Sequence, residues 1–339
     1  MLKFNWPTTG NEDRLAELEN DLLNERMNHA YLFTGVAEVG KLTAAKFFAK
    51  LILCENNACD VCEVCQKIRA NIHPQLTIAD KLWIEGVNEN FEQLAKKTNF
   101  NQSHRARTPK SKTDTIRLND LREILARIHT SHDKQQIFVI HDIERMNRES
   151  SNFFLKTLEE PPPQTIFLLT TSNQPLLLPT IISRCRVLYF GNVSPPAIEK
   201  MITREFPCLD EEKRMRVVNF SMGKPVRAAK LASDPEIFRE FTEYFRKITT
   251  LLEKPNPANK MFFAEKITET PTEIQKFFEA FTHFLRSFLL SRTRQPIDTS
   301  RYSAKKIVEL LRATNISRKL VFDKNVNPRL VIENLLLQI

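Results

Sequence analysis

The sequence lacks the marks of a membrane or secreted protein. No apolar run among its 339 residues approaches the roughly 20 residues that a membrane-spanning helix needs. Residues 1–7 contain no apolar segment of the kind that signal peptides carry. We also find no internal repeat and no low-complexity tract. These absences predict a cytoplasmic globular protein, and the length predicts two or three domains.

Glycine is scarce, and two of the six glycines lie in one short segment. Gly35 and Gly40 belong to the run Gly-Val-Ala-Glu-Val-Gly-Lys-Leu-Thr, whose spacing lets backbone N–H groups surround a phosphate while Lys41 adds positive charge. In a complete loop of this type the next residue is Ser or Thr, and its hydroxyl binds Mg²⁺. Leu42 stands there instead, and Thr43 comes one residue late. The segment predicts a phosphate-binding loop that lacks one part of a hydrolytic site.

The neighbours of this loop have the pattern that the motif requires. An apolar run of strand length, residues 31–34, ends at the first glycine, and residues 44–53 place apolar side chains at helical spacing. Strand, glycine-rich turn and helix form the setting of a phosphate-binding loop. A tight turn with a solvated lysine would also satisfy the bare motif, but this setting disfavours that interpretation.

A second apolar strand leads to residues that weaken the same site. Residues 137–140 form a continuous apolar run, as in a parallel strand buried on both faces. In P-loop ATPases such a strand ends in Asp, which helps to hold magnesium, and then Glu, which polarises the attacking water. Here the two positions hold His141 and Asp142. Nucleotide binding through Lys41 and backbone amides stays open, whereas efficient hydrolysis is not expected.

Four of the six cysteines lie close together in the sequence. Cys54, Cys59, Cys62 and Cys65 have the spacing C-x4-C-x2-C-x2-C, which can surround one tetrahedral Zn²⁺. A cytosolic compartment disfavours disulfides, and incidental buried cysteines are the weaker alternative. Because all four positions are thiols, no coordination site remains for a reacting water. The pattern predicts a structural zinc site.

The balance of charge is basic. The chain has 50 Lys and Arg residues against 41 Asp and Glu residues, a net charge of +9 and a pI near 9.2. This balance favours an anionic partner such as nucleic acid or nucleotide, although both signs are interspersed. The densest basic stretch, residues 104–112, lies in a polar segment of about 25 residues that reads as a mobile loop. A solvated insertion is favoured there, and phosphate contact remains an alternative.

Further motifs point together to one family. Residues 152–162 contain Leu-Lys-Thr-Leu-Glu-Glu-Pro-Pro, and residues 183–185 read Ser-Arg-Cys. Residues 28–33 read Asn-His-Ala-Tyr-Leu-Phe, and residues 327–336 read Asn-Pro-Arg-Leu-Val-Ile-Glu-Asn-Leu-Leu. In this order, and with the four cysteines after the loop helix, the sequence closely resembles bacterial clamp-loader subunits of the AAA+ class. The resemblance runs from near residue 20 to the C-terminus.

The resemblance implies roles for several side chains. The family contains ATPase motor subunits and a stator subunit with a degraded ATP site, and Leu42 and His141 match the stator pattern. The lack of a long C-terminal extension disfavours the tau motor subunit. Arg184 of Ser-Arg-Cys would be an arginine finger that reaches ATP on the neighbouring subunit, an effect of about 10³–10⁵ in rate in comparable systems. Asn173 matches a sensor position, and Arg227 matches the second sensor, although an exposed helix arginine would explain Arg227 equally well.

The predicted architecture has three parts. Residues 1–190 would form an α/β P-loop domain of the AAA+ type, with the zinc-binding insertion near residues 54–65 and parallel strands beginning near Tyr31, Leu76, Ile137, Ile166 and Val187. Residues 191–234 would form a helical lid. Residues 235–339 would form an all-α collar, where phenylalanines at three- and four-residue steps predict core faces or subunit interface.

The resemblance also implies partners. They would be the tau/gamma motor and delta subunits of a DNA polymerase III clamp loader and, through that complex, the sliding clamp and primer-template DNA. In this interpretation the cofactor is structural zinc, and ATP binding by this chain is doubtful. One alternative is an active motor ATPase in which Thr43 and Asp142 replace the missing groups. Another is a zinc-containing nucleic-acid-binding protein with no ring partner.

Overall fold

The structure is a computed structural model with two compact units, Met1–Ser233 and Asp234–Ile339. The basic stretch at 104–112 lies outside the described part of the chain. Among the described residues, no helix is long and apolar enough to cross a membrane. The structure describes residues 2–79, 115–126, 135–253, 256–290, 303–321 and 325–338.

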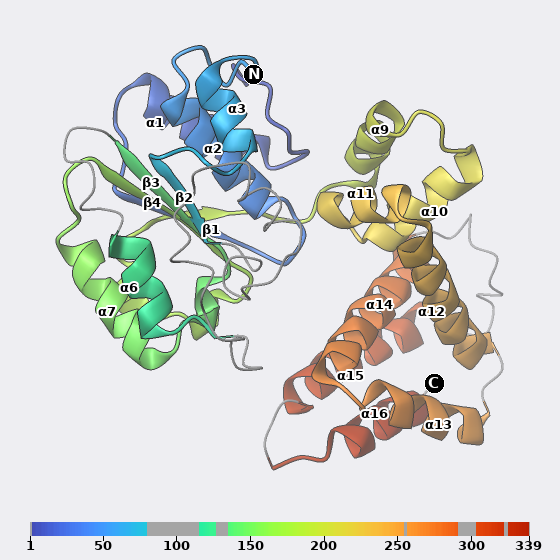
Figure 1. Ribbon diagram of the computed structural model, residues 1–339. Coiled ribbons are helices and arrows are strands. Elements are labelled where there is room, and N and C mark those ends of the chain that lie inside the picture. The colour runs from blue at the N-terminus through green and yellow to red at the C-terminus, as the bar shows by residue number, and fades with distance from the viewer. Residues whose placement is uncertain are drawn as a thin grey trace. The chain divides into compact units, whose positions relative to one another are not determined.

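A five-stranded parallel sheet forms the centre of the first unit, as the sequence predicted (Figure 1). Its order is β2-β3-β4-β1-β5. β1, β3 and β4 are buried along their whole length, which agrees with their continuous apolar sequences. Parallel pairing brings the strand starts together at one end of the sheet, the amino end, and the strand finishes together at the other, the carboxyl end. The strands are β1 Ala30–Thr34, β2 Leu76–Ala79, β3 Gln136–Ile140, β4 Thr165–Thr171 and β5 Arg186–Tyr189.

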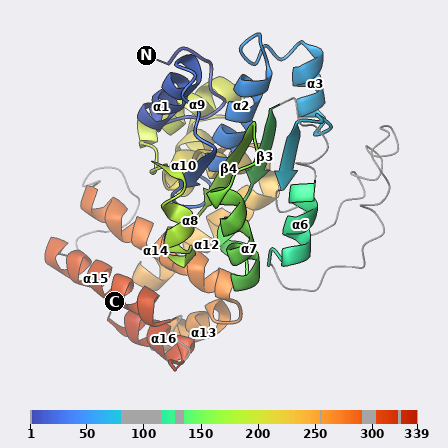
Figure 2. The same cartoon turned by 90° about the vertical axis from the view of Figure 1, so that its left-hand side faces the viewer.

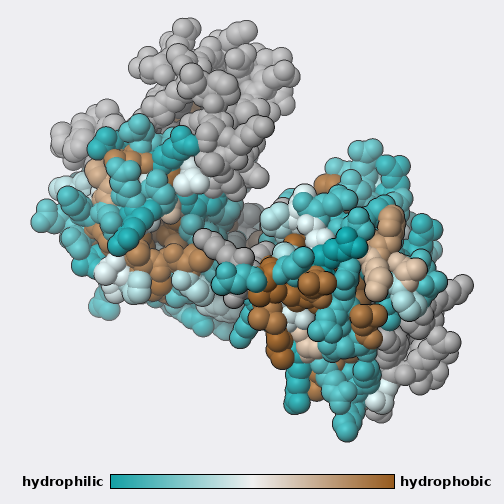
Figure 3. All heavy atoms as spheres, turned by 90° about the horizontal axis from the view of Figure 1, so that it is seen from below, coloured by the Kyte–Doolittle hydropathy of each residue, from teal (hydrophilic) through white to brown (hydrophobic). Residues whose placement is uncertain are grey.

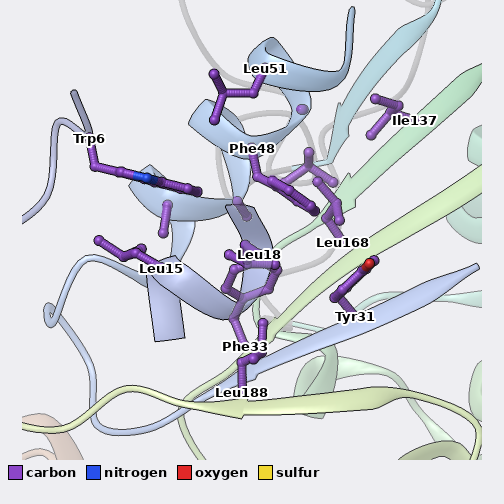
Figure 4. Packing of buried hydrophobic residues seen from close by; sticks show 14 of the residues in the cluster. Trp6, Leu15, Leu18, Tyr31, Phe33, Phe48, Leu51, Ile137, Leu168 and Leu188 are labelled. Carbon is purple, nitrogen blue, oxygen red and sulfur yellow. The ribbon is translucent and has the colours of Figure 1, made fainter. Parts of the chain in front are cut away.

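One face of the sheet is covered by α1 (Glu12–Leu23), α2 (Lys41–Leu53) and α3 (Glu63–Arg69). Figure 4 shows Phe48 of α2 packed over the strands, and its ring lies 5.4 Å from that of Tyr31. Burial of each such large side chain contributes about 1.5–3 kcal/mol. α2 begins at the carboxyl end of the sheet and returns the chain towards the amino end, where β2 begins.

The other face is covered by α6 (Leu118–Ala126), α7 (Arg148–Glu159) and the short α8 (Pro179–Ile182). Figures 1 and 2 show α6 and α7 across the sheet from α2 and α3. Phe154 of α7 meets the ring of Phe167 edge-on at 5.3 Å. Asn147 starts α7, because its side chain accepts a hydrogen bond from the Ser150 backbone N–H.

Three helices complete the first unit: α9 (Pro195–Glu205), α10 (Glu211–Ser221) and α11 (Pro225–Ser233), here called the lid helices. They pack against one another around Ile198, Val217 and Leu231, which are buried. The structure divides its two units after Ser233. The finer predicted boundary at 190/191 stays a prediction.

The second unit is entirely helical in its described residues. Phe277, Phe278, Phe281 and Phe284 of α14 are buried, and the rings of Phe277 and Phe281 stack at 5.2 Å. Other apolar residues are exposed, among them Phe262, Ile316 and Leu330. Figure 3 shows brown, hydrophobic surface among the hydrophilic surface of the face that it presents. The helices are α12 Pro235–Glu253, α13 Pro257–Ile267, α14 Pro271–Leu290, α15 Ala304–Leu320 and α16 Pro328–Leu337.

Candidate functional sites at the two ends of the sheet

The glycine-rich loop joins β1 to α2 at the carboxyl end of the sheet. Gly35 has φ of 139°, and a Cβ built on it would lie 2.0 Å from the carbonyl oxygen of Phe190, so no other residue fits. Gly40 has φ of 95° and comes directly before the first residue of α2. Both conformations are ones that glycine adopts without strain. The sequence prediction of strand, loop and helix is therefore correct.

Lys41 is buried at the start of α2 and points back into its own loop. Its Nζ donates to the carbonyl oxygens of Gly35 and Val36, each at 2.7 Å, and lies 3.2 Å from the Ser172 hydroxyl. Burial lowers the pKa of Lys41 to about 8, although nearby Asp142 and Glu144 favour the charged form. The ammonium is thus held by the loop rather than by bulk water.

Two carboxylates stand near Lys41 at the carboxyl end of the sheet. Asp142 follows β3 in a left-handed conformation with φ of 53°, and burial raises its pKa. Glu144 accepts a hydrogen bond from the Ser172 backbone N–H at 2.8 Å. Asp142 Oδ1 and Glu144 Oε2 are buried and have no hydrogen-bond partner among the described residues. The loop therefore has a charged environment, but the carboxylates differ in position from the expected Asp-Glu pair.

The residues that replace the magnesium-binding side chains have other contacts. Leu42 is half-buried and packs against the apolar core between the sheet and α2. His141 Nδ1 lies 2.7 Å from the Thr170 hydroxyl, and its Nε2 lies 3.3 Å from Asp142 Oδ2. Thr43, the late hydroxyl, is half-buried in the first turn of α2. Neither Leu42 nor His141 supplies the oxygen ligand that magnesium prefers.

The sequence interpretation named Asn173 and missed its neighbour. The backbone N–H of Asn173 donates to the Thr171 hydroxyl at 3.1 Å, and the residue precedes a short 3₁₀ helix, Gln174–Leu176. Ser172 instead supplies the hydroxyl next to Lys41. The signal that could have found Ser172 is its place directly after the apolar strand β4, which is the neighbour of β1.

Arg227 of the lid reaches the loop through an acidic residue. Its Nε donates to Glu38 Oε2 at 2.7 Å, and only 13% of its side chain is exposed. Lys230 donates to the other oxygen of Glu38 at 2.9 Å. Arg227 therefore contacts the phosphate loop through Glu38, and its role as a second sensor stays a prediction. Glu38 was not singled out from the sequence.

The cysteine cluster lies between α2 and α3. Its four Sγ atoms all lie within 4.8 Å of one another, and Cys54 Sγ is 3.9 Å from Cys59 Sγ and 3.7 Å from Cys62 Sγ. Four sulfurs bound to one Zn²⁺ at about 2.3 Å would be about 3.8 Å apart, so the cluster fits a tetrahedral metal. The backbone N–H groups of Val61 and Cys62 lower the pKa of Cys59 to about 6. A thiolate is the form that binds metal.

Arg184 stands at the amino end of the sheet, between α8 and β5. It donates to the Thr180 carbonyl oxygen at 3.0 Å and pairs with Glu159 at 2.8 Å, with 33% of its side chain exposed. Arg186, the first residue of β5, pairs with Tyr31 of β1, whereas the loop follows the last residue of β1. Three residues of strand, about 10 Å, therefore separate the starts of β1 and β5 from the loop.

A half-buried ion pair with a buried carboxylate lies beside Arg184. Arg186 bonds both carboxylate oxygens of Asp21 in α1, and the Tyr31 hydroxyl donates to the same carboxylate at 2.9 Å. Burial, together with Asp21, raises the pKa of Tyr31 to about 12. The two arginines of Arg-Cys-Arg therefore differ: Arg186 is a structural side chain, and Arg184 is the more weakly held one.

Comparisons with known proteins agree with the resemblance. Residues 10–194 match the protein family described as DNA polymerase III, delta subunit. Subunit tau of Bacillus subtilis (strain 168) is 31% identical over 193 residues, which are 56% of this chain and 29% of tau. Subunit delta' of the same organism is 31% identical over 198 residues, which are 56% of this chain and 50% of delta'. The chain thus spans half or less of the length of these relatives.

A solved structure of similar length was also found. The DNA polymerase III gamma subunit-related protein of Thermotoga maritima is 17% identical, with a TM-score of 0.44 over 94% of this chain and 97% of that one. The family match rests on sequence and covers more than half of the chain. This chain therefore belongs to the family described as DNA polymerase III, delta subunit, among the clamp-loader proteins that its sequence resembles.

Proposed function

We propose that the chain is the delta-prime type of clamp-loader subunit, a stator that hydrolyses no ATP in its own loop and completes the active site of a neighbour. One observation carries the proposal: the Ser-Arg-Cys arginine lies at the amino end of the sheet, whereas the loop lies at the carboxyl end. A side chain in that position cannot reach a phosphate in its own loop. A nucleotide that contacts this side chain would therefore have to be held by another subunit.

The loop itself supports the stator role. The positions for the magnesium-binding hydroxyl and carboxylate hold Leu42 and His141, and both side chains have other contacts. Lys41 bonds the carbonyl oxygens of its own loop. A phosphate would have to displace these bonds, and a metal would have to bind without its usual ligands. We therefore expect weak nucleotide binding and no efficient turnover.

Arg184 would act as the arginine finger. Its guanidinium is partly exposed and is held by one carboxylate, Glu159, and one carbonyl, so it can exchange these partners for a phosphate. Charge that develops on a transferred phosphoryl group is stabilised strongly by such a cation. The Asp21–Arg186 ion pair would keep the neighbouring backbone rigid.

The cysteine cluster would hold one structural Zn²⁺. Cys54, Cys59, Cys62 and Cys65 would fill all four coordination positions, so the metal would stabilise the segment between α2 and α3 and do no chemistry. Two N–H···S bonds, from Cys62 to Cys59 and from Cys65 to Cys62, already orient the sulfurs. These bonds are second-sphere contacts of the kind that tune metal sites.

The partners would be tau/gamma and delta subunits and, through the assembled loader, the sliding clamp and primer-template DNA. The helical second unit would be the collar through which subunits assemble. Exposed apolar side chains on α13, α15 and α16 support that role, since exposed apolar surface often marks protein interfaces. They are Met261, Phe262, Val308, Ile316, Leu320, Leu330 and Leu337.

A reconstituted loader tests the proposal. Loaders containing wild-type chain, Arg184→Ala or the control Arg204→Ala, an exposed lid arginine, would be compared for assembly and for DNA-stimulated ATP hydrolysis. We expect all three to assemble and only Arg184→Ala to hydrolyse ATP more slowly. Equal hydrolysis in all three would remove the finger assignment. Substantial ATP turnover by the purified chain alone would instead favour a motor ATPase.

A further inference from the structure

Glu38 has a backbone conformation that is strained for a residue with a Cβ. It lies in the middle of the phosphate loop with φ of 66°, in the left-handed region. A residue with a Cβ is destabilised there by about 1–2 kcal/mol relative to ordinary helical or extended backbone, and glycine is not. Strain of this kind persists where surrounding contacts hold it, and it often marks a functional position.

The compensating contacts come from the lid. Both carboxylate oxygens of Glu38 accept bonds, one from Arg227 at 2.7 Å and the other from Lys230 at 2.9 Å. The backbone joins in, because the Val226 N–H at the start of α11 donates to the Glu38 carbonyl oxygen at 3.1 Å. Three groups of one lid helix therefore hold one loop residue that lies almost 190 positions away.

This contact differs from an ordinary surface ion pair. The side chains of Arg227 and Glu38 are 13% and 24% exposed, whereas those of Arg216 and Glu212, paired within α10, are 48% and 74% exposed. Burial alone would raise the pKa of Glu38, yet Arg227 and Lys230 bring it below its usual value. The pair is therefore better shielded from water and salt than exposed pairs, which contribute little.

The positive charge around the loop would stabilise an anion. Lys41 and Lys224 are both buried near the loop, and Arg227 and Lys230 approach it from the lid. A phosphate group is the usual anion in such surroundings. Here the loop carries its own carboxylate.

We propose that Glu38 is an internal anion that holds lid helix α11 on the phosphate loop without nucleotide, and that it competes with a nucleotide phosphate for Arg227. Glu38 is in this view a positioning residue. The inference deepens the proposed stator role, since it makes the shape of the first unit independent of ATP. It does not depend on Arg184.

Hydrogen exchange in the isolated chain tests the contact of Glu38 with α11, here called the latch. The reporter is the Val226 amide, whose acceptor is the Glu38 carbonyl oxygen. In Glu38→Gln we expect its exchange to quicken by about tenfold, equivalent to about 1.4 kcal/mol. Arg227→Met should have a similar effect, and the double variant should add little to either. Glu212→Gln, which removes the exposed pair in α10, is the matched control and should change nothing at Val226.

Glu38→Gly separates the latch from global stability. Glycine relieves the left-handed backbone, so we expect an unchanged or higher unfolding midpoint together with faster exchange at Val226. Calorimetry with ATP should then detect tighter binding to Glu38→Gly and Glu38→Gln than to wild type.

Two results would overturn the proposal. Unchanged Val226 exchange in Glu38→Gln would show that the carboxylate does not hold the lid. Unchanged ATP affinity would remove the competition with phosphate. Both measurements use the chain without partners, so their failure is distinguishable from failure of the Arg184 assignment, which is measured in the assembled loader.

Discussion

The two ends of the parallel sheet differ in how complete their sites are. The carboxyl end has a glycine-rich loop, a buried lysine and two carboxylates, but Leu42 and His141 replace the side chains that would position magnesium. The amino end has four cysteine sulfurs within 4.8 Å of one another, a half-buried Asp21–Arg186 ion pair and a partly exposed Arg184. The end that usually binds nucleotide is the less complete one.

The difference indicates which residues of a nucleotide-binding fold are needed for folding and which are needed only for hydrolysis. The loop glycines and Lys41 keep their positions because they join β1, α2 and β4, and the fold needs that junction. At the two positions where magnesium ligands are expected, Leu42 packs against the core and His141 bonds the Thr170 hydroxyl. The fold therefore does not need the magnesium ligands. At the amino end, Arg184 is held by the Thr180 carbonyl oxygen and the Glu159 carboxylate, while Arg186, two residues on, is paired with Asp21.

Among the substitutions that test this comparison, loss of the metal should lower the stability of the chain most. We expect wild-type chain purified without chelators to contain one zinc, and Cys59→Ser to contain almost none. The unfolding midpoint should then fall by roughly 10 °C, since structural zinc contributes several kcal/mol. Metal analysis and thermal unfolding measure both, with Cys208→Ser, an exposed cysteine outside the cluster, as control. Equal zinc content in Cys59→Ser and wild type would contradict the assignment.

Removal of the buried Asp21 carboxylate at the amino end should have the second largest effect on stability. Asp21→Ala leaves Arg186 and the Tyr31 hydroxyl without their shared acceptor, so we expect the free energy of unfolding to fall by about 2–3 kcal/mol. Glu17→Ala removes a 3.6 Å contact with Arg186 and the pair that Glu17 forms with Arg14 one turn away, from a side chain that is 34% exposed, and should cost less than about 1 kcal/mol. Urea unfolding measures both. Equal losses would mean that the Asp21 pair does not fix this end.

The buried lysine at the carboxyl end predicts a pH dependence. The pKa of Lys41 is about 8 in the folded chain, below its ordinary value of 10.5, so burial of the charged form destabilises the fold at neutral pH. Between pH 8 and 10.5 the unfolded chain keeps this proton while the folded chain releases it, and the free energy of unfolding rises with pH.

Lys41→Met removes this titration. We expect its free energy of unfolding, relative to wild type, to fall by about 1–3 kcal/mol as the pH rises from 8 to 10.5. Urea unfolding at several pH values measures the difference, and Lys200→Met, at an exposed position of α9, is the control. A difference that does not change with pH would show that Lys41 is not desolvated in the folded chain.

Much of this arrangement could be predicted from the sequence. Apolar runs bounded by turn residues predicted all five strands, although β1, β3, β4 and β5 each begin one residue before the predicted start. The loop was recognised because its residues are contiguous. The cysteine cluster was recognised for the same reason, and its sulfurs do lie together. The strongest sequence signals were local in the chain.

The contacts that the sequence did not reveal join distant segments. Ser172 contacts Lys41 only because β4 lies next to β1, and Asp21 meets Arg186 only because α1 lies beside β5. Glu38 looked like an ordinary loop residue until the lid placed Arg227 on its carboxylate. Such pairs depend on which elements become neighbours, and hydrophobic periodicity does not record that.

The most direct test of the account compares both ends of the sheet in one assembly. Loaders would be reconstituted with Lys41→Ala or Arg184→Ala in this chain, and their DNA-stimulated ATP hydrolysis would be measured beside wild type. We expect the loader with Lys41→Ala to hydrolyse ATP at the wild-type rate and the loader with Arg184→Ala to be slower by several-fold. A slower Lys41→Ala together with an unaffected Arg184→Ala would contradict it, because the loop would then be the active end.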